Sequence, residues 1–235
     1  MKHILVTGAA HGIGRAIAEE FAKQQDTQIF VNARTAEKEL MELAESICGI
    51  PLLYDLSKDR EVEKMFREIA AYGDIDVLIN NAGISHIGLL QDMTIEDWNR
   101  VIATNLTSVF SCCKRVIPAM VRKGEGRIVN ISSVWGVAGA STEVAYSASK
   151  GGMNSFTKAL AKELAPSRIT VNGVACGVID TRMNACFSEE ERVQLKEEIP
   201  MGRFGTAQEV AKLVFDLTQH SYLTGQIVTL DGGYL

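Results

Sequence analysis

The stretch VTGAAHGIGRA, residues 6–16, joins a short apolar run to a helix-like segment. Its glycines are Gly8, Gly12 and Gly14, which gives a G-x-x-x-G-x-G spacing. Glycine adopts positive φ at little cost and lets backbone N–H groups approach an anion. The N-terminus of a helix adds a partial positive charge at the same place. A tight turn without a ligand is the alternative, but three glycines directly after a buried strand favour a site for a dinucleotide phosphate. His11 lies either near that phosphate or merely in the turn.

Apolar runs alternate with helical patterns along the rest of the chain, as in a parallel sheet covered by helices. The runs are continuously apolar, which is typical of strands buried on both faces. No Pro/Ser-rich linker, repeat or low-complexity segment divides the chain. The sequence therefore predicts one α/β domain over residues 1–235, a doubly wound Rossmann fold with a seven-stranded parallel sheet and helices on both faces. The expected strands are residues 3–7, 28–32, 50–54, 76–80, 126–131, 168–174 and 226–231.

Composition excludes several classes of protein. The 235 residues are 46% hydrophobic and 23% charged, with a net charge of −5, so a large nucleic-acid surface is not expected. No apolar run is long enough for a transmembrane helix, and the first apolar run is too short for a signal peptide. We expect a cytoplasmic protein without a membrane partner. The five cysteines form no C-x-x-C pair and the four histidines show no ligand spacing with them, so neither a metal site nor a disulfide framework is expected.

The end of the second expected strand bears on the choice of cofactor. An acidic residue about twenty positions after the glycines would bind the ribose 2′-hydroxyl of NAD. Arg34 stands there, in VNART, and an arginine favours the 2′-phosphate of NADP through its charge and its fork of donors. NADP(H) is therefore favoured, and NAD(H) remains possible. Alternatively, Arg34 is a solvated loop cation paired with Glu37.

A phenol and an ammonium stand four residues apart in YSASK, residues 146–150, shortly after the Ser-rich NISSV. On a helix this spacing puts Tyr146 and Lys150 on one face. A lone pair of this kind often occurs on a solvated helix face. If the pair is functional, the ammonium favours phenolate and lowers the tyrosine pKa from its ordinary value near 10. The tyrosine would then exchange protons near neutral pH.

The sequence resembles the classical short-chain dehydrogenase/reductase family, on motifs spread over nearly the whole chain. No single motif is specific, but their order is. They are TGAAHGIG at residues 7–14, Asp55, NNAG at 80–83, Asn105 in TNLTSVF, Ser133 in NISSV, Tyr146 with Lys150, and the tail IPMGRFGTAQEVA with YLTGQIVTLDGGYL.

The resemblance implies a catalytic tetrad of Asn105, Ser133, Tyr146 and Lys150. Tyr146 would act as acid for ketone reduction and as base for alcohol oxidation, and Ser133 would hold the carbonyl oxygen. Lys150 would also bind the nicotinamide ribose, and Asn105 would support a water between Lys150 and solvent. The implied cofactor-binding residues are Gly8, His11, Gly12, Ile13, Gly14, Asn32, Arg34, Asp55, Leu56, Asn81, Ala82, Gly83, Tyr146, Lys150, Gly177, Ile179 and Thr181.

Several residues in these motifs could serve the fold instead of the cofactor. Asp55 with Leu56 resembles the pair that contacts adenine, but Asp55 could instead cap the helix expected near Lys58, a role for which Ser57 competes. Asn80 is expected to be structural. The chain departs from the family at Cys176, where a proline is usual, which leaves the nicotinamide loop less restricted. A reactive thiol there is not favoured.

The acidic segment at residues 181–200 is expected to form a small substrate lid or a solvated amphipathic helix. The helices around Asn105 and Tyr146 carry apolar stripes beyond what one sheet face needs. Together with the resemblance, this predicts a homotetramer; stripes that merely fill the core are the alternative.

Within the family the chain is most similar to 3-oxoacyl-acyl-carrier-protein reductases, on GRIVNISSVWG, VAYSASKGGM, ITVN and IPMGRFGTAQEVA. The implied reaction is the NADPH-dependent reduction of a ketone, a 3-oxoacyl thioester linked to acyl carrier protein or CoA. A docking patch for an acidic carrier protein is expected near the active-site mouth; its candidates are Arg122, Lys123, Arg127 and Arg168, which could also be ordinary solvated charges. The alternatives are the same chemistry on a steroid, sugar or small carbonyl, and a non-catalytic nucleotide-binding protein.

Overall fold

The computed structural model of this chain describes residues 1–184 and 188–235. All seven expected strands are present and form one parallel sheet in the order β3-β2-β1-β4-β5-β6-β7. This confirms the predicted doubly wound fold. The strands are β1 (Lys2–Val6), β2 (Thr27–Ala33), β3 (Ile50–Leu53), β4 (Val77–Asn80), β5 (Gly126–Ser133), β6 (Ile169–Cys176) and β7 (Ile227–Leu230).

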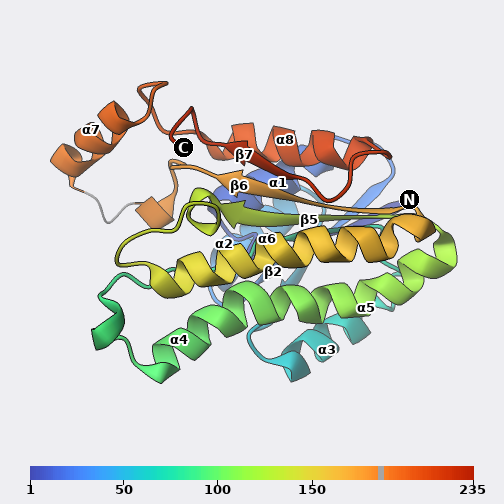
Figure 1. Ribbon diagram of the computed structural model, residues 1–235. Coiled ribbons are helices and arrows are strands. Elements are labelled where there is room, and N and C mark those ends of the chain that lie inside the picture. The colour runs from blue at the N-terminus through green and yellow to red at the C-terminus, as the bar shows by residue number, and fades with distance from the viewer. Residues whose placement is uncertain (185–187) are drawn as a thin grey trace.

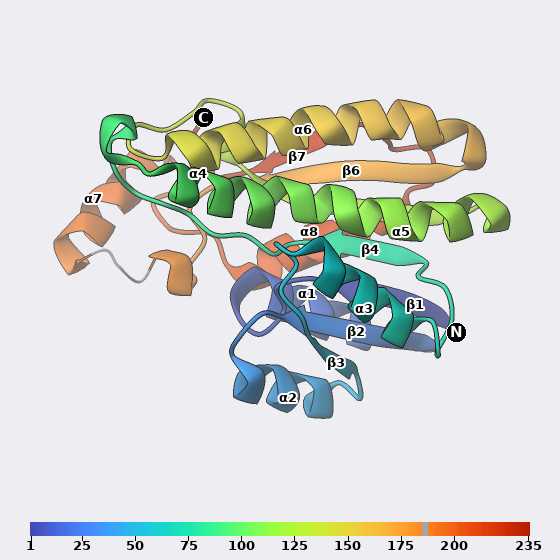
Figure 2. The ribbon, with the colours of Figure 1, turned by 90° about the horizontal axis from the view of Figure 1, so that it is seen from below.

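Helices cover both faces of the sheet (Figures 1 and 2). One buried cluster joins the sheet to α1, α2 and α8, and the other joins it to α3, α5 and α6. Every residue of β4 and β6 is buried, as continuous apolar runs predict. The helices are α1 (Gly12–Ala22), α2 (Glu37–Ser46), α3 (Asp59–Ile69), α4 (Ile95–Ile102), α5 (Ser108–Lys123), α6 (Val144–Leu164), α7 (Glu189–Glu198) and α8 (Ala207–Gln219), with short 3-10 turns η1 (Leu90–Asp92), η3 (Val134–Gly136), η4 (Ala165–Ser167) and η5 (Arg182–Asn184).

One long helical region runs from α4 into α5 through a π-helical turn, η2 (Ala103–Thr107). A π turn inserts one extra residue into the helical ladder and often occurs at functional sites. The buried Asn105 lies within this turn.

The chain order of the strands reverses between β1 and β4, which lie side by side. In open parallel sheets, ligands bind in the crevice at the carboxyl ends of the strands on either side of such a reversal. The Gly-rich turn follows β1, Asn81 follows β4, and Ser133 ends β5. The fold therefore brings the predicted motifs to one edge of the sheet.

The predicted basic docking patch is in the wrong place. Arg122 and Lys123 end α5, Arg127 is the second residue of β5, and Arg168 directly precedes β6, so all four lie at the amino ends of the strands. Ser133 lies at the other end of β5, six residues beyond Arg127 and about 20 Å away along the extended strand. Three of the four also have acidic partners: Asp74, Asp76 and Glu125.

Candidate active site

The Gly-rich turn is fastened to the neighbouring strand by hydrogen bonds. The Thr7 hydroxyl accepts from the backbone N–H groups of Asn81 and Ala82 at 2.9 and 3.0 Å. The Asn81 amide donates in return to the carbonyls of Thr7 and Gly8, both at 2.9 Å. The turn that was predicted to receive the phosphate is therefore held by groups at the end of β4, which limits its freedom to move.

Two glycines of this turn are required by close approach. Gly8 has φ +63°, and a Cβ there would stand 2.7 Å from the Cα of Ala82. A Cβ on Gly14 would stand 2.4 Å from the Gly8 carbonyl oxygen and 2.5 Å from the Asn81 amide nitrogen. Because real Cβ atoms essentially never come this close, only glycine lets the first turn of α1 pack against the end of β1.

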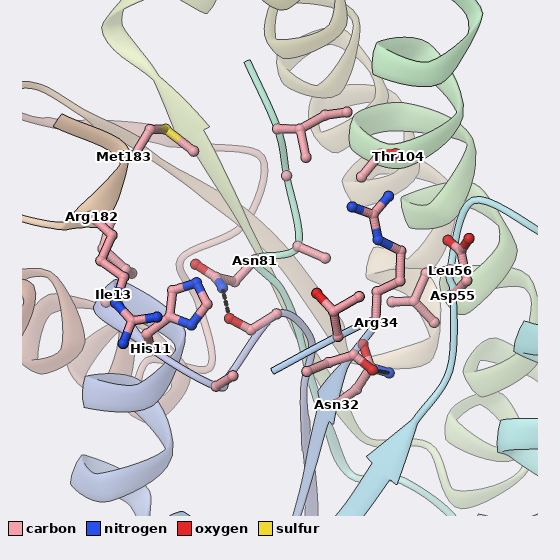
Figure 3. A pocket seen from close by; sticks show the side chains of 18 of the residues that line it. His11, Ile13, Asn32, Arg34, Asp55, Leu56, Asn81, Thr104, Arg182 and Met183 are labelled. Carbon is pink, nitrogen blue, oxygen red and sulfur yellow. Dashed lines mark hydrogen bonds between the residues drawn. The ribbon is translucent and has the colours of Figure 1, made fainter. Parts of the chain in front are cut away.

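A cavity of about 550 Å³ opens over this turn (Figure 3). Its lining contains most of the residues predicted to bind the cofactor: Gly8, His11, Gly12, Ile13, Asn32, Arg34, Asp55, Leu56, Asn81, Ala82, Gly83 and Thr181. Thr104 also lines it, and its hydroxyl has no hydrogen-bond partner among the described residues. The glycine-only turn, the helix N-terminus and this unpaired hydroxyl fit a phosphate-bearing dinucleotide.

Asn32 and Arg34 lie at the far end of the cavity and have different roles. Asn32 donates to the carbonyls of Leu52 and Tyr54 at 3.0 and 3.1 Å, so its amide holds β2 to β3. Arg34 is exposed and makes no ion pair within the described part of the chain, so the predicted alternative of a Glu37 partner is not observed. Figure 3 shows its guanidinium extending along the cavity beside Asp55 and Leu56. Arg34 is therefore available to an anion.

Asp55 shapes the turn before α3. Its carboxylate accepts from the Ser57 backbone N–H and hydroxyl at 3.1 and 2.7 Å. The N-cap position of α3 is Lys58, so neither Asp55 nor Ser57 caps this helix. Hydrogen bonds from Ser57 and the nearby Lys58 hold the pKa of Asp55 below its ordinary value, although burial, the largest single influence, acts against them.

Tyr146 and Lys150 lie together at the buried start of α6, as their spacing predicted. The Lys150 Nζ lies 5.7 Å from the centroid of the Tyr146 ring and donates to the carbonyl of Ile131 at 2.7 Å. Gly136 makes this packing possible, because a Cβ there would stand 2.8 Å from the Cβ of Lys150. Ser133, at the end of β5, hydrogen-bonds to Tyr146 and accepts from the Trp135 N–H at 3.1 Å.

The pKa of Tyr146 differs from the sequence-based prediction. Burial raises the pKa of this phenol well above 10, the hydrogen bond with Ser133 lowers it, and the nearby Cys176 and Glu143 raise it. The prediction counted the charges of the Lys150 ammonium and of a cationic nicotinamide, and it omitted the cost of burying phenolate. Burial also lowers the pKa of Lys150 from 10.5 to about 8.

Asn105 joins α6, which carries Tyr146 and Lys150, to the neighbouring backbone. Its side-chain amide donates to the Ile84 carbonyl at 2.9 Å and to the Ser149 hydroxyl at 3.0 Å, and its oxygen accepts from the Ile84 N–H at 2.8 Å. A Cβ on Gly83 would stand 3.4 Å from that oxygen and 3.5 Å from the Lys150 Nζ. Asn105 and Lys150 thus flank the same glycine, while the amide of Asn105 fixes the segment after β4.

A second cavity, of about 310 Å³, adjoins the first, since both are lined by Ser85 and Met183. Ser133, Tyr146 and Gly177 line it. Glu143 also lines it, and its carboxylate accepts a hydrogen bond from Ser85 across the cavity. The second cavity therefore contacts the phenol of Tyr146 on one side and the first cavity on the other.

The remaining predicted residues lie away from the two cavities or serve the fold. Gly14 and Ile179 line neither cavity: Gly14 is a packing residue, and the Ile179 side chain is buried in the core. Cys176 is buried and lies opposite Ser133 in the β5–β6 ladder. Burial raises the pKa of its thiol to about 12, which makes it a poor nucleophile. Asn80 donates to Asn130 at 2.8 Å, within the sheet core, in keeping with a structural role.

The expected lid falls partly outside the described residues, which exclude 185–187. The rest consists of η5 and α7, and α7 begins with a capping box between Ser188 and Glu191. Sequence reasoning missed several lining residues, chiefly Ser85, Trp135, Glu143, Arg182 and Leu195. Proximity to NNAG, Ser133, Tyr146 and Thr181 was the signal available for the first four.

A nicotinamide-dependent oxidoreductase is the class of protein that this fold and site define. The sequence model of the family described as short chain dehydrogenase matches residues 2–192. The chain belongs to the short-chain dehydrogenase family.

Similar proteins span nearly the whole chain. It is 42% identical over 240 residues to the 3-oxoacyl-(acyl-carrier-protein) reductase FabG of Aquifex aeolicus, covering 97% of this chain and 95% of that protein. It is 40% identical over 237 residues to the enzyme of the same name from Escherichia coli, covering 99% and 96%. The crystal structure of a putative gluconate dehydrogenase from Agrobacterium tumefaciens matches with a TM-score of 0.94 and 31% identity, covering 99% of this chain and 95% of that one. In the described part of the chain, no helix has the length and apolar character needed to cross a membrane.

Proposed function

We propose that this enzyme reduces the ketone of a 3-oxoacyl thioester to the 3-hydroxyacyl form, with NADPH as the favoured cofactor. The observation that carries the proposal is that Tyr146 and Ser133 line a substrate-sized cavity, with the buried Lys150 ammonium 5.7 Å from the centre of the Tyr146 ring. The bound nicotinamide would supply the hydride. The similarity to two 3-oxoacyl-(acyl-carrier-protein) reductases supports this choice of substrate.

Tyr146, Ser133 and Lys150 each have a separate role in the proposed reaction. The neutral phenol of Tyr146 donates its proton to the carbonyl oxygen, and the raised pKa keeps that proton present at neutral pH. The Ser133 hydroxyl donates a hydrogen bond to the same oxygen and stabilises the charge that develops there. The Lys150 ammonium lies close enough to favour the phenolate that remains. It has three donors and uses one on Ile131; the other two have no hydrogen-bond partner among the described residues and would serve the nicotinamide ribose. The predicted water beside Asn105 remains a prediction.

The proposal of NADPH rests on Arg34. Its guanidinium lines the dinucleotide cavity at the end of β2, where an acidic residue would favour NAD. No described carboxylate pairs with it. An unpaired arginine at this point favours the extra phosphate of NADPH, and NADH remains usable with lower affinity.

The charge of the second cavity favours a neutral thioester over a sugar acid. Among its described lining residues there is no lysine or arginine, whereas Glu143, Glu191 and Glu198 are present. A substrate carboxylate beside the carbonyl would be repelled and would lose its hydration without a cationic partner. A thioester carries no charge near the reacting carbon, and the apolar side chains of Trp135 and Leu195 suit an acyl chain.

Another ketone or secondary alcohol is the second candidate, because this fold serves many substrates. The similarity to a putative gluconate dehydrogenase supports a sugar-like substrate. A non-catalytic nucleotide-binding protein is the remote alternative. The homotetramer, the cytoplasmic location, the docking of an acyl carrier protein and the lid over residues 181–200 remain predictions, as does the single domain.

A substrate panel with both reduced cofactors tests the proposal. Oxidation of NADPH would be followed with acetoacetyl-CoA, ethyl acetoacetate, free acetoacetate and a keto sugar acid. We expect the thioester to be the best substrate, the neutral ester to be slower, and both free acids to be poor. A keto sugar acid turned over faster than the thioester would replace our choice of substrate. Binding of NADPH without oxidation by any carbonyl would support the non-catalytic alternative.

A further inference from the structure

Arg182 is a cation at the dinucleotide cavity to which no role was assigned from the sequence. It lies in η5, directly after Thr181, and lines the cavity on the side away from Arg34. Figure 3 shows its guanidinium beside His11 and Ile13, whereas Arg34 lies beside Asp55 and Leu56. The two arginines therefore approach one cavity from opposite sides.

The neighbourhood of Arg182 is the phosphate-binding turn. The Thr181 methyl group lies 3.4 Å from the position of a Cβ on Gly12, the first residue of α1. The charge of Arg182 is close enough to lower the pKa of His11, in addition to the larger effect of burial. The N–H groups at the start of α1 have no carbonyl partners within the helix. A guanidinium, a helix N-terminus and a glycine turn thus face the same space.

Arg182 also reaches across the crevice. Its guanidinium lies 3.4 Å from the carboxylate of Glu39 in α2, 143 positions away in the sequence. The Arg182 side chain is 63% exposed and that of Glu39 is 33% exposed. Ion pairs this accessible contribute little to stability, so exchanging Glu39 for a phosphate costs little. A phosphate offers the fork of Arg182 a more highly charged partner than one carboxylate.

We infer that Arg182 binds a phosphate group of the dinucleotide in place of its ion pair with Glu39. This contact links the segment after β6 to the bound cofactor. The candidate groups are the diphosphate and the 2′-phosphate, which share the chemistry that a guanidinium recognises. The inference concerns cofactor binding alone, so it holds whichever carbonyl compound is the substrate.

Calorimetric titration of the purified protein with NADPH and with NADH tests this inference, without substrate. For Arg182→Gln we expect affinity to fall about tenfold, the loss of one charge-assisted contact. An equal loss for both dinucleotides identifies the diphosphate as the partner, and a loss confined to NADPH identifies the 2′-phosphate. Unchanged affinity for both dinucleotides overturns the inference.

Two further variants separate this contact from a general effect of charge. Arg192→Gln removes the same charge from α7, where Arg192 pairs with Asp180 at 2.9 Å and lines neither cavity. We expect its dinucleotide affinity to equal that of the wild type, and a loss matching that of Arg182→Gln would overturn the inference. Glu39→Gln removes the competing carboxylate and should tighten binding about twofold to threefold, whereas weaker binding would mean that the ion pair itself shapes the site.

Discussion

The ammonium of Lys150 lies 5.7 Å from the centre of the Tyr146 ring and is anchored to the Ile131 carbonyl at 2.7 Å. Both groups are almost completely buried, at 3% and 8% exposure. The enzyme thus keeps a charge and an ionisable phenol in a place where both pKa values move away from their ordinary values, in opposite directions. Groups with such pKa shifts cluster at functional sites. The residues of such sites often lower the stability of the folded protein.

The change Tyr146→Phe should remove the proton donor and leave the cofactor cavity intact. We expect the rate of ketone reduction to fall by about 10²–10⁴-fold, with the affinity for NADPH within a factor of about two or three. Steady-state kinetics and a binding titration measure the two effects. Tyr222→Phe, at a fully exposed tyrosine, is the control and should behave as wild type. If the Tyr146→Phe enzyme kept most of its activity, the phenol would be excluded as the acid.

The change Lys150→Met should increase stability while destroying activity. The fall in the lysine pKa from 10.5 to about 8 corresponds to a free-energy cost of about 3 kcal/mol for burying the charged form. Because methionine leaves the Ile131 carbonyl unpaired, we expect a net gain of about 1–2 kcal/mol at pH 7. Thermal unfolding followed by circular dichroism measures this gain, and a clear loss of stability would contradict it.

The same variant should respond to pH in a definite direction. Below pH 8, Lys150 is charged in the native and unfolded states, and the full cost is present. Between about pH 8 and pH 10.5 the unfolded chain binds more protons than the native chain, so the wild type becomes more stable as pH rises. The stability advantage of the Lys150→Met variant should therefore shrink across that interval. An advantage that grows with pH would show that the lysine pKa is not lowered.

The change Arg34→Ala should weaken NADPH much more than NADH. The guanidinium has no described ionic partner, so its loss affects the ligand rather than the fold. We expect about tenfold weaker NADPH binding and little change for NADH. Calorimetry with both dinucleotides measures the difference. An equal loss for the two would assign Arg34 to a group that they share.

The change Glu143→Gln should broaden substrate choice. Its carboxylate lies on the wall of the second cavity and raises the pKa of Tyr146. The neutral amide should improve kcat/KM for free acetoacetate by several-fold, with a much smaller change for the thioester, because only the free acid is repelled. Glu197→Gln, on α7 outside the cavity lining, removes the same charge as a control. Equal gains in both variants would mean that the net charge of the protein, rather than the charge of the cavity wall, limits the use of free acetoacetate.

The change Gly14→Ala should damage the Gly-rich turn. The new methyl group would meet the Gly8 carbonyl oxygen at 2.4 Å, so we expect a loss of about 1–3 kcal/mol of stability and weaker binding of both dinucleotides. Gly151→Ala is a matched control on α6, where the methyl group would lie in ordinary contact at 3.5 Å. That variant should be neutral or slightly stabilised. Denaturant unfolding measures both, and a stable Gly14→Ala protein would refute the close packing.

The sheet and its helices could be predicted because their signals are local. Apolar runs and the glycine turn each act over about ten or fewer residues, and the motifs then follow at the carboxyl ends of strands. The π turn was missed because its extra residue leaves the apolar pattern almost unchanged. Arg182 and Glu143 were missed because their importance depends on what lies across the crevice. The predicted direction of the Tyr146 pKa shift was wrong because burial, which a sequence does not display, is the largest influence on this phenol.

The error over the basic patch has a different origin. Arg127 is the second residue of an expected strand, and the start of a parallel strand lies at the edge away from the ligand crevice. The sequence already contained this information. The prediction used the charge of the four basic residues and ignored which end of each strand they lie at. In the structure, three of them pair with acidic residues instead.

The π turn at Ala103–Thr107 rotates α5 about the axis of the long helical region relative to α4. One added residue turns everything beyond it by about 100° about the helix axis. That offset lets the Asn105 side chain bond to Ile84 and Ser149 while Val109, Cys112 and Val116 still belong to the core beside the sheet. Deleting a single residue within the turn would restore a regular helix and force the chain to give up one of these two orientations. The length of this segment is therefore as strictly constrained as the identity of the residues that it carries.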